Sequence, residues 1–188
     1  MRIIGGVHRG TQLTGLGAGD TAAHLRPTSD RVRENLFNIL QGGRFGEVIR
    51  DKTVLDLFAG TGALGLEALS RGAAHVTFVE NGKVGARLIH DNIARLKRRG
   101  ATTLLKGDAT KMGFGPQAQS TALVFLDPPY GQGLGAQALT AARATGWIAE
   151  NTLIVWEENT QQPPPPGFTL QDARRYGDTW ITFLSATP

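Results

Sequence analysis

Cysteine is absent from the 188 residues of this sequence. The chain therefore has no disulfide framework and no thiolate ligands for a metal ion. Its four histidines, at positions 8, 24, 75 and 90, show none of the spacings found in metal sites. We therefore predict no metal site, and the lack of cysteine fits a reducing cytosol.

Long apolar segments are also missing. No stretch approaches the roughly 18 apolar residues of a transmembrane helix, and the N-terminal residues lack the apolar core of a signal peptide. Hydrophobic residues nevertheless make up 40% of the chain, which is enough for the core of one domain of this length. We expect a soluble, cytoplasmic protein with no membrane partner.

Positive charge is concentrated in two stretches of the chain. The net charge is +4; residues 1–50 hold seven arginines against four acids, and residues 83–106 hold seven basic residues against one acid. Clusters of this kind favour a polyanion such as nucleic acid as the partner. For residues 83–106, a basic face that contacts only solvent is the alternative.

A glycine-rich turn follows the first predicted core strand. Residues 53–58 form a short apolar run, the turn contains Gly60 and Gly62, and a helix is predicted over 63–71. The glycines let the backbone turn sharply and come close to a ligand. With Gly65 the spacing is G-x-G-x-x-G, the pattern of a nucleotide-binding βαβ unit. A turn of this type without a ligand is the alternative.

Two carboxylates indicate which ligand the turn could hold. Asp56 lies just before the turn, where it would repel the pyrophosphate of a dinucleotide. S-adenosylmethionine has no phosphate, and its sulfonium and ammonium groups favour a nearby carboxylate. Glu80, at the end of the second predicted strand, can accept hydrogen bonds from ribose hydroxyls. These residues favour S-adenosylmethionine over a dinucleotide.

Strands and helices alternate along the rest of the chain, which predicts an α/β fold with a doubly wound, mostly parallel sheet. Helices are expected over 29–41, 63–71, 83–99 and 134–146, strands over 53–58, 75–80, 102–106, 121–126 and 152–157, and a C-terminal antiparallel hairpin over 168–174 and 179–184. Residues 2–4 and 11–13 predict a small N-terminal hairpin, and residues 163–166 a stiff surface connection. We divide the chain into an N-terminal hairpin and helix extension, 1–50, and a domain over 51–188.

Four polar strand ends should meet in such a sheet, because parallel strands present their carboxyl ends at one edge, where ligands bind. They are residues 59–62, Glu80, Asp108 and residues 127–130. Their convergence predicts a single active site.

The last of these strand ends, Asp127-Pro128-Pro129-Tyr130, has the chemistry to hold a nucleobase amine. The prolines stiffen the turn, and the Asp127 carboxylate and Pro128 carbonyl are two acceptors for the two N–H donors of an exocyclic amine. Those bonds would orient the nitrogen lone pair toward a methyl sulfonium, so catalysis would be largely positioning. Tyr130 would stack on the base, which must be unpaired or flipped out.

This tetrapeptide matches the (N/D/S)-P-P-(Y/F/W) motif of amino-methyltransferases acting on adenine N6, cytosine N4 or guanine N2. The stretches 2–10 (RIIGGVHRG) and 25–38 (LRPTSDRVRENLFN) narrow the match. With them the chain resembles the RsmD family from residue 2 to about residue 184. These bacterial enzymes methylate a guanine N2 in small-subunit ribosomal RNA. The loop over 14–24 and the prolines at 163–166 depart from the common pattern, but both lie away from the motifs.

The resemblance implies a Rossmann-like class I methyltransferase fold with S-adenosylmethionine as the cofactor. By position, the implied cofactor-binding residues are Asp56, Phe58, Ala59, Gly60, Thr61, Gly62, Glu80, Asn81, Asp108 and Ala109. Among them, Glu80 matches the ribose acceptor and Asp108 the adenine contact. The implied catalytic residues are Asp127, Pro128, Pro129 and Tyr130. The partner would be ribosomal RNA, naked or within a partly assembled small subunit, and we expect a monomer.

Five N-terminal arginines lie outside the predicted cofactor unit, and arginine binds phosphate through its bidentate fork. The candidate RNA contacts are Arg2, Arg9, Arg26, Arg31 and Arg33. Two alternatives remain open. Arg26 or Arg31 could pair with the cofactor's carboxylate, and Arg31 and Arg33 could pair with Asp30 and Glu34 on a solvated helix.

Three other functions remain as alternatives. An adenine-N6 methyltransferase acting on DNA or other RNA would share this chemistry, although DNA enzymes normally carry a larger target-recognition domain. A nucleotide-binding oxidoreductase is disfavoured by Asp56 and by residues 127–130. A non-catalytic RNA-binding protein is disfavoured because residues 127–130 are intact.

Overall fold

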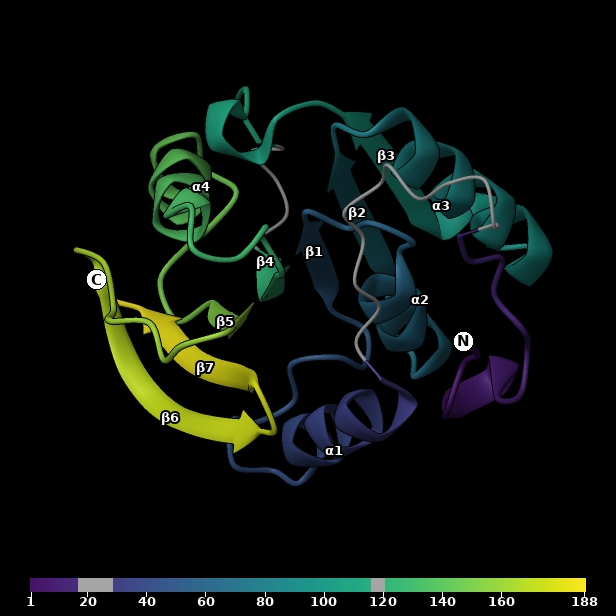
Figure 1. Cartoon of the computed structure of the whole chain (residues 1–188), viewed down its shortest axis with the longest axis horizontal. Helices are drawn as coiled ribbons and strands as arrows, with labels where there is room; N and C mark the ends of the chain where they lie inside the picture. The colour runs from purple at the N-terminus through teal and green to yellow at the C-terminus, as the bar shows by residue number, and fades with distance from the viewer. Residues whose placement is uncertain (17–28, 116–120) are drawn as a thin grey trace.

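The computed structural model describes residues 1–16, 29–115 and 121–188. A seven-stranded sheet runs through the molecule in the order β3-β2-β1-β4-β5-β7-β6 (Figure 1). Its strands are β1 (Thr53–Leu57), β2 (His75–Glu80), β3 (Thr102–Lys106), β4 (Thr121–Leu126), β5 (Leu153–Glu158), β6 (Phe168–Tyr176) and β7 (Thr179–Ala186). Strands β1 to β5 are parallel, and β7 pairs antiparallel with both β5 and β6. The predicted doubly wound sheet with its C-terminal hairpin is confirmed.

Helices cover both faces of this sheet. They are α1 (Asp30–Gln41), α2 (Ala63–Ser70), α3 (Lys83–Leu96) and α4 (Leu134–Ala144), with the short 3-10 helices η1 (Gly6–His8), η2 (Arg99–Ala101) and η3 (Ala109–Lys111). Helices α1, α2 and α3 pack on one face, and α4 and η3 pack on the other (Figure 1). Alternate strand residues supply the two cores: Val54 and Phe125 belong to the first, Leu55 and Val124 to the second. Because both faces are buried, the central strands are apolar almost throughout.

Local signals set the helix ends. The Ser29 hydroxyl accepts a hydrogen bond from Val32 N at 3.3 Å and caps the start of α1. Helix α3 ends at Leu96, three residues before the predicted end, because Lys97 adopts a left-handed φ of 55°. Helix α4 likewise ends at Ala144 and not at residue 146.

The N-terminal segment, residues 1–14, folds back on itself as the predicted hairpin, but a single antiparallel bridge takes the place of the two predicted strands. Its two sides share an isolated bridge between Arg2 and Gln12, and η1 makes the turn between them. The backbone amides of Ile4 and Gly5 donate to a carboxylate of α2, at 2.8 Å each. These bonds attach the N-terminal segment to α2.

Two remaining predictions concern the connections. Residues 163–166 run along the surface outside any helix or strand, as predicted. Most of the predicted loop over 14–24, and Arg26, fall outside the described residues.

Of the helices that the structure describes, none combines the length and apolar character needed to cross a bilayer.

Candidate active site

The carboxyl ends of β1, β2 and β4 meet at one edge of the sheet, next to the point where the strand order reverses. Backbone pairing continues just past the strands. Ala59 N donates to Val79 O at 3.1 Å, and Asp127 N donates to Leu57 O at 3.4 Å. The loops that follow the three strands are therefore held side by side, at the place where ligands bind in sheets of this type.

The turn after β1 uses backbone conformations of the left-handed region. Gly60 has a φ of 57°, Gly62 of 77°, and Phe58, which is not glycine, of 58°. Gly62 N donates to Ala59 O at 2.7 Å and closes the turn. A left-handed non-glycine residue costs about 1–3 kcal/mol, and such residues gather at functional sites. At Gly60 and Gly62, therefore, no side chain covers the backbone of the turn.

Asp56 is buried beneath the start of α2. Its Oδ2 atom accepts a hydrogen bond from Gly65 N at 2.9 Å. A Cβ atom at Gly65 would lie 2.9 Å from that oxygen and 2.4 Å from the ring of Phe78, so this approach requires glycine. Burial raises the pKa of Asp56 to about 8; the Gly65 bond opposes this, and nearby Glu80 adds to it. Asp56 therefore supports the helix N-terminus and lies close to a second carboxylate.

Glu80 braces the glycine turn from the end of β2. Its Oε2 accepts from Gly60 N at 2.8 Å and its Oε1 accepts from Gly82 N at 2.6 Å. A Cβ atom at Gly85 would lie 2.8 Å from the carboxyl carbon, so α3 can pass this side chain only at a glycine. Asn81, the next residue, is exposed. A carboxylate has about four acceptor sites, so two amide bonds leave capacity for ribose hydroxyls.

Asp108 lies beside Glu80, because Gly107 N donates to Glu80 O at 3.1 Å. Its Oδ1 atom caps η3 by accepting from Thr110 N at 2.9 Å and from the Thr110 hydroxyl at 2.7 Å. These bonds lower the pKa of Asp108, so the side chain is an ionised acceptor at neutral pH. Ala109 is buried behind it.

Asp127 follows β4 and is half-buried among other acids. Burial raises its pKa well above the ordinary value, and the charges of Glu157, Asp56 and Glu158 raise it further. Although carboxylates gather here, no group of three or more His, Asp or Glu side chains within the described ranges could hold a metal ion. The site is an acidic edge, and the neighbouring acids oppose the ionisation of Asp127.

Two acids at the end of β5, neither of them predicted from the sequence, hold the loop that follows Asp127. The Tyr130 hydroxyl donates to Glu157 Oε1 at 3.1 Å, and Gly131 N donates to Glu158 Oε1 at 3.0 Å. Both glutamates are buried, and burial together with Glu157 raises the pKa of Tyr130. The available signal was their position, since they follow an apolar strand whose end lies beside that of β4.

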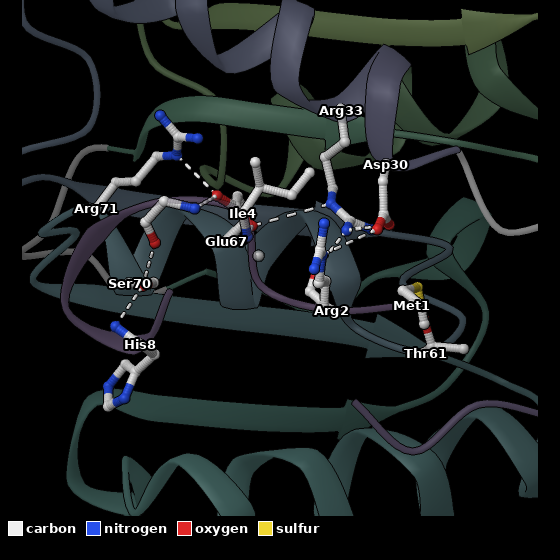
Figure 2. Close-up of polar contacts among 12 residues, drawn as sticks. Met1, Arg2, Ile4, His8, Asp30, Arg33, Thr61, Glu67, Ser70 and Arg71 are labelled. Carbon is white, nitrogen blue, oxygen red and sulfur yellow. Dashed lines mark hydrogen bonds and ion pairs between the residues drawn. The ribbon is translucent and has the colours of Figure 1, made fainter. Parts of the chain in front are cut away.

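Arg33 of α1 corrects the sequence analysis. The sequence predicts an RNA contact, but the structure buries this side chain completely. Arg33 donates to the Arg2 carbonyl and to Asp30 Oδ1 at 2.9 Å, and lies 3.9 Å from Glu67 (Figure 2). Burial lowers its pKa, while the two acids act to raise it. Arg33 joins α1 to the N-terminal segment and to α2, and it cannot reach a phosphate outside the protein.

Glu67 of α2 is the acid at the centre of this network, and sequence reasoning did not identify it. It is fully buried and accepts from the amides of Ile4 and Gly5 and from Arg71 Nε, each at 2.8 Å (Figure 2). A buried carboxylate is tolerated only when paired and hydrogen-bonded in this way. The N-terminal segment is thus fixed to the helix that begins at the glycine turn.

Asn92 of α3 links the same segment to the turn itself. It is fully buried; its Oδ1 accepts from Thr14 N at 2.7 Å, and its Nδ2 donates to Thr14 O at 3.0 Å and to Thr61 O at 3.1 Å. The Thr61 hydroxyl also donates to Met1 Sδ at 3.8 Å (Figure 2). The N-terminal segment therefore packs against the glycine turn at two points.

Of the other predicted RNA contacts, Arg2, Arg9 and Arg31 are exposed, and Arg26 lies outside the described residues. Two contacts join the N-terminal segment to the basic end of α3. Arg98 Nε donates to His8 Nε2 at 3.1 Å, and Arg95 donates to the Thr14 hydroxyl at 3.3 Å. The two basic stretches of the sequence thus lie side by side.

Several known proteins are similar to this chain in sequence and in fold. A family model described as "Conserved hypothetical protein 95" matches residues 1–185. Ribosomal RNA small subunit methyltransferase D from Escherichia coli (strain K12) is 40% identical over 166 residues, which cover 88% of this chain and 78% of that protein. The chain belongs to the RsmD family. A Haemophilus influenzae protein of the same name is 36% identical over 182 residues, covering 94% of this chain and 89% of its own.

A solved structure is similar to this chain over its whole length. It comes from Escherichia coli, is described as a candidate methyltransferase, and superposes with a TM-score of 0.81 at 34% identity, covering 100% of this chain and 98% of that one. The predictions of the RsmD family, of a class I methyltransferase fold and of a methyltransferase enzyme are confirmed.

Proposed function

We propose that this RsmD-family protein transfers a methyl group from S-adenosylmethionine to the exocyclic N2 amine of a guanine in small-subunit ribosomal RNA. One observation carries this proposal: the glycine turn and the acidic loop of residues 127–130 lie together at one edge of the sheet. Glu80 holds the turn through a hydrogen bond from Gly60 N. The names of the relatives support small-subunit ribosomal RNA as the substrate. Residues 51–188 would form the methyltransferase domain, and residues 1–50 the RNA-contacting extension.

The residues at this edge fit S-adenosylmethionine. The turn leaves the backbone bare at Gly60 and Gly62, and the carboxylates of Asp56, Glu80 and Asp108 lie at the ends of three neighbouring strands. An acidic set suits ribose hydroxyls, an adenine amine and a cationic group, and it repels a pyrophosphate. When bound, the cofactor supplies a methyl group on a sulfonium sulfur, which keeps the electron pair of the broken C–S bond. The residues that would hold it are Asp56, Phe58, Ala59, Gly60, Thr61, Gly62, Glu80, Asn81, Asp108 and Ala109.

Asp127 and Pro128 would hold the target amine, with the carboxylate and the carbonyl each accepting one N–H. This arrangement turns the lone pair of N2 toward the methyl carbon, so most of the catalysis is positioning. The lone pair forms the new N–C bond, and N2 then gives up one proton. Asp127 is the acceptor, because burial and its acidic neighbours raise its pKa and so make its carboxylate a better base.

Tyr130 would provide the stacking surface for the target base. Stacking of a base on an aromatic ring is worth about 1–3 kcal/mol. The bond from its hydroxyl to Glu157 fixes one end of the ring, and Pro129, which precedes it, stiffens the backbone. The guanine must be unpaired or flipped out of a helix to reach this loop.

The exposed arginines would hold the RNA backbone around the target. Arg2, Arg9 and Arg31 are the N-terminal contacts that remain after the burial of Arg33, and Arg26 or Arg31 could instead pair with the cofactor's carboxylate. The basic end of α3 adjoins the N-terminal segment through Arg98 and His8. We take the protein to act as a monomer in the cytoplasm, on RNA that is naked or within a partly assembled small subunit.

Methyl transfer from labelled S-adenosylmethionine tests this function. Purified small-subunit ribosomal RNA, partly assembled small subunits and DNA are incubated separately with the protein, and the products are digested and analysed by mass spectrometry. We expect N2-methylguanosine from one or both RNA substrates and none with Asp127→Ala. N6-methyladenine as the product would favour the adenine-N6 alternative. No transfer to any substrate, with the cofactor bound, would contradict the proposal.

A further inference from the structure

Glu157 lies beside the catalytic loop, and in the function proposed so far it only fixes the ring of Tyr130. Strands β4 and β5 pair in parallel, and Leu126 lies opposite Trp156. Asp127 and Glu157 are the next residues of the two chains, so they follow this pair at neighbouring positions. The Tyr130 hydroxyl, on the loop that begins at Asp127, donates to Glu157 Oε1 at 3.1 Å, so the Glu157 carboxyl lies against this loop. The site therefore presents a second acid next to the one that would hold the target amine.

The edge of guanine explains what a second acid could do. Guanine carries two adjacent donor groups on its Watson–Crick edge, the N1–H and the N2 amine, whereas N1 of adenine is an acceptor. A flipped base is read by hydrogen bonds to this edge. A carboxylate is an acceptor only, so it matches N1–H of guanine and repels the lone pair on N1 of adenine.

We propose that Glu157 is a specificity-determining residue that accepts a hydrogen bond from N1–H of the target guanine, while Asp127 and Pro128 accept from the N2 amine. This inference rests on the proposed function. It assigns the choice between guanine and adenine to one named side chain.

The surroundings of Glu157 suit this role. Its exposed fraction is 5%, so little water competes for its oxygens, and hydrogen bonds to a buried charge are strong. The Tyr130 hydroxyl donates to Oε1 and orients the carboxyl group, and a carboxylate accepts more than one hydrogen bond. If the bound base has no donor for Glu157, a buried carboxylate is left without a hydrogen bond, which is costly. Sites that depend on such a bond discriminate against the mismatched substrate by a factor on the order of 10⁴ in kcat/KM in favourable cases.

Replacing the target guanine by 2-aminopurine isolates this contact. 2-Aminopurine keeps the amine at position 2 but has an acceptor at N1. The guanine that the parent protein methylates is located first, and RNA with either base at that position is then compared in single-turnover assays. We expect the parent to prefer guanine by at least about 100-fold. In Glu157→Gln the preference should fall at least tenfold, because an amide can donate to N1 of 2-aminopurine and can also accept from N1–H.

Two matched variants separate direct contact from structural effects. Glu158→Gln changes the neighbouring acid and should keep the parent's preference. Glu157→Asp retains the charge, so it should prefer guanine even at a reduced rate. Equal affinity for S-adenosylhomocysteine in the parent and in Glu157→Gln confirms that the variant is folded.

The outcomes distinguish this inference from the proposed function. An unchanged ratio of guanine to 2-aminopurine in folded Glu157→Gln would overturn the inference while leaving guanine methylation intact. If Glu158→Gln lowers the ratio as much as Glu157→Gln does, the loss comes from a general disturbance of this loop and the direct contact is refuted. If the parent itself methylates adenine and no guanine, the proposed function fails first.

Discussion

Glu80 Oε2 accepts a hydrogen bond from Gly60 N at 2.8 Å, so the end of β2 braces the turn that follows β1. The other oxygen of the same carboxylate accepts from Gly82 N at 2.6 Å, and the side chain is buried. One side chain therefore shapes the turn and also presents charge where a ribose would lie. Its loss should affect the cofactor through both roles.

We expect Glu80→Ala to weaken cofactor binding. A charge-assisted hydrogen bond is worth about 1.5–3 kcal/mol, so the loss of even one to the ribose should raise the dissociation constant by roughly 10- to 150-fold. Titration calorimetry with S-adenosylhomocysteine measures this. Glu150→Ala, which removes an exposed acid, is the control and should bind as the parent does. Equal dissociation constants for the parent and Glu80→Ala would contradict the assignment.

Asp127→Ala should abolish methyl transfer and leave cofactor affinity nearly unchanged, because Asp127 is assigned to the target amine and not to the cofactor. Loss of an acceptor that orients the reacting nitrogen should lower the single-turnover rate by at least about 100-fold. The rate is measured with saturating cofactor, and the affinity by calorimetry. A variant that binds cofactor poorly but turns over normally at saturation would refute the assignment.

The pH dependence of methyl transfer should report the ionisation of Asp127. In the proposed reaction the ionised carboxylate of Asp127 holds the target amine and accepts its proton. Burial and the charges of Glu157 and Asp56 raise the pKa of Asp127. A raised pKa means that the active form is lost on acidification at a higher pH than for an ordinary aspartate. We expect the single-turnover rate to fall as pH is lowered, with a midpoint well above 3.8 that belongs to the coupled acids together. A rate that stays constant down to pH 4 would exclude this role.

The sequence was sufficient to predict the fold, because the signals involved are local. Apolar runs that end at glycine or at an acid gave the parallel strands, and Ser29 marked the start of α1. The N-terminal segment folds back on itself as predicted, with one antiparallel bridge between Arg2 and Gln12, but its attachment to α2 was not predicted, for a non-local reason. The amides of Ile4 and Gly5 bond to Glu67, about sixty residues later in the chain, and no pattern near residue 4 records that contact.

The candidate site was predictable only in part, and for the same reason. Strand ends could be placed at one edge from topology alone. Arg33 was misassigned, because an arginine in a charged helix resembles a surface residue until its partners Asp30 and Glu67 are known. Glu157 was missed because its contact with Tyr130 depends on β5 lying next to β4.

Asp56 should make the free energy of unfolding depend on pH in the absence of cofactor. Its pKa of about 8 in the folded protein exceeds the ordinary 3.8, so between these values the folded chain holds a proton that the unfolded chain has released. Stability therefore falls as pH rises through this window, by up to about 1.4 kcal/mol per pH unit for one proton. Asp56→Asn keeps an acceptor for Gly65 N and cannot ionise.

Urea unfolding at pH 5 and pH 8 measures this effect. The advantage of Asp56→Asn over the parent should be larger at pH 8 than at pH 5. A difference that is the same at both pH values would mean that Asp56 is already ionised in the folded protein and that burial does not control its charge.

The exposed arginines of the N-terminal segment should determine how strongly RNA binding depends on salt. Arg2 has a side chain that is 61% exposed and lies 3.7 Å from Asp30, and Arg9 is exposed near the turn of the segment. Each phosphate contact contributes about 0.7–0.9 to the slope of log affinity against log salt. Changing Arg2 and Arg9 together to alanine should weaken RNA binding and flatten that slope by up to about two units, with cofactor affinity unchanged.

A double variant of Arg174 and Arg175 removes the same charge from β6, at the far end of the strand order from β2 and β3 (Figure 1). Both variants lower the net charge equally, so a general loss of attraction for RNA would affect them alike. A phosphate contact by Arg2 and Arg9 predicts a flatter slope in the N-terminal variant alone. If its RNA affinity and salt slope both match those of the parent, the segment does not hold the RNA backbone. The basic end of α3, which Arg98 joins to His8, would then be the better candidate.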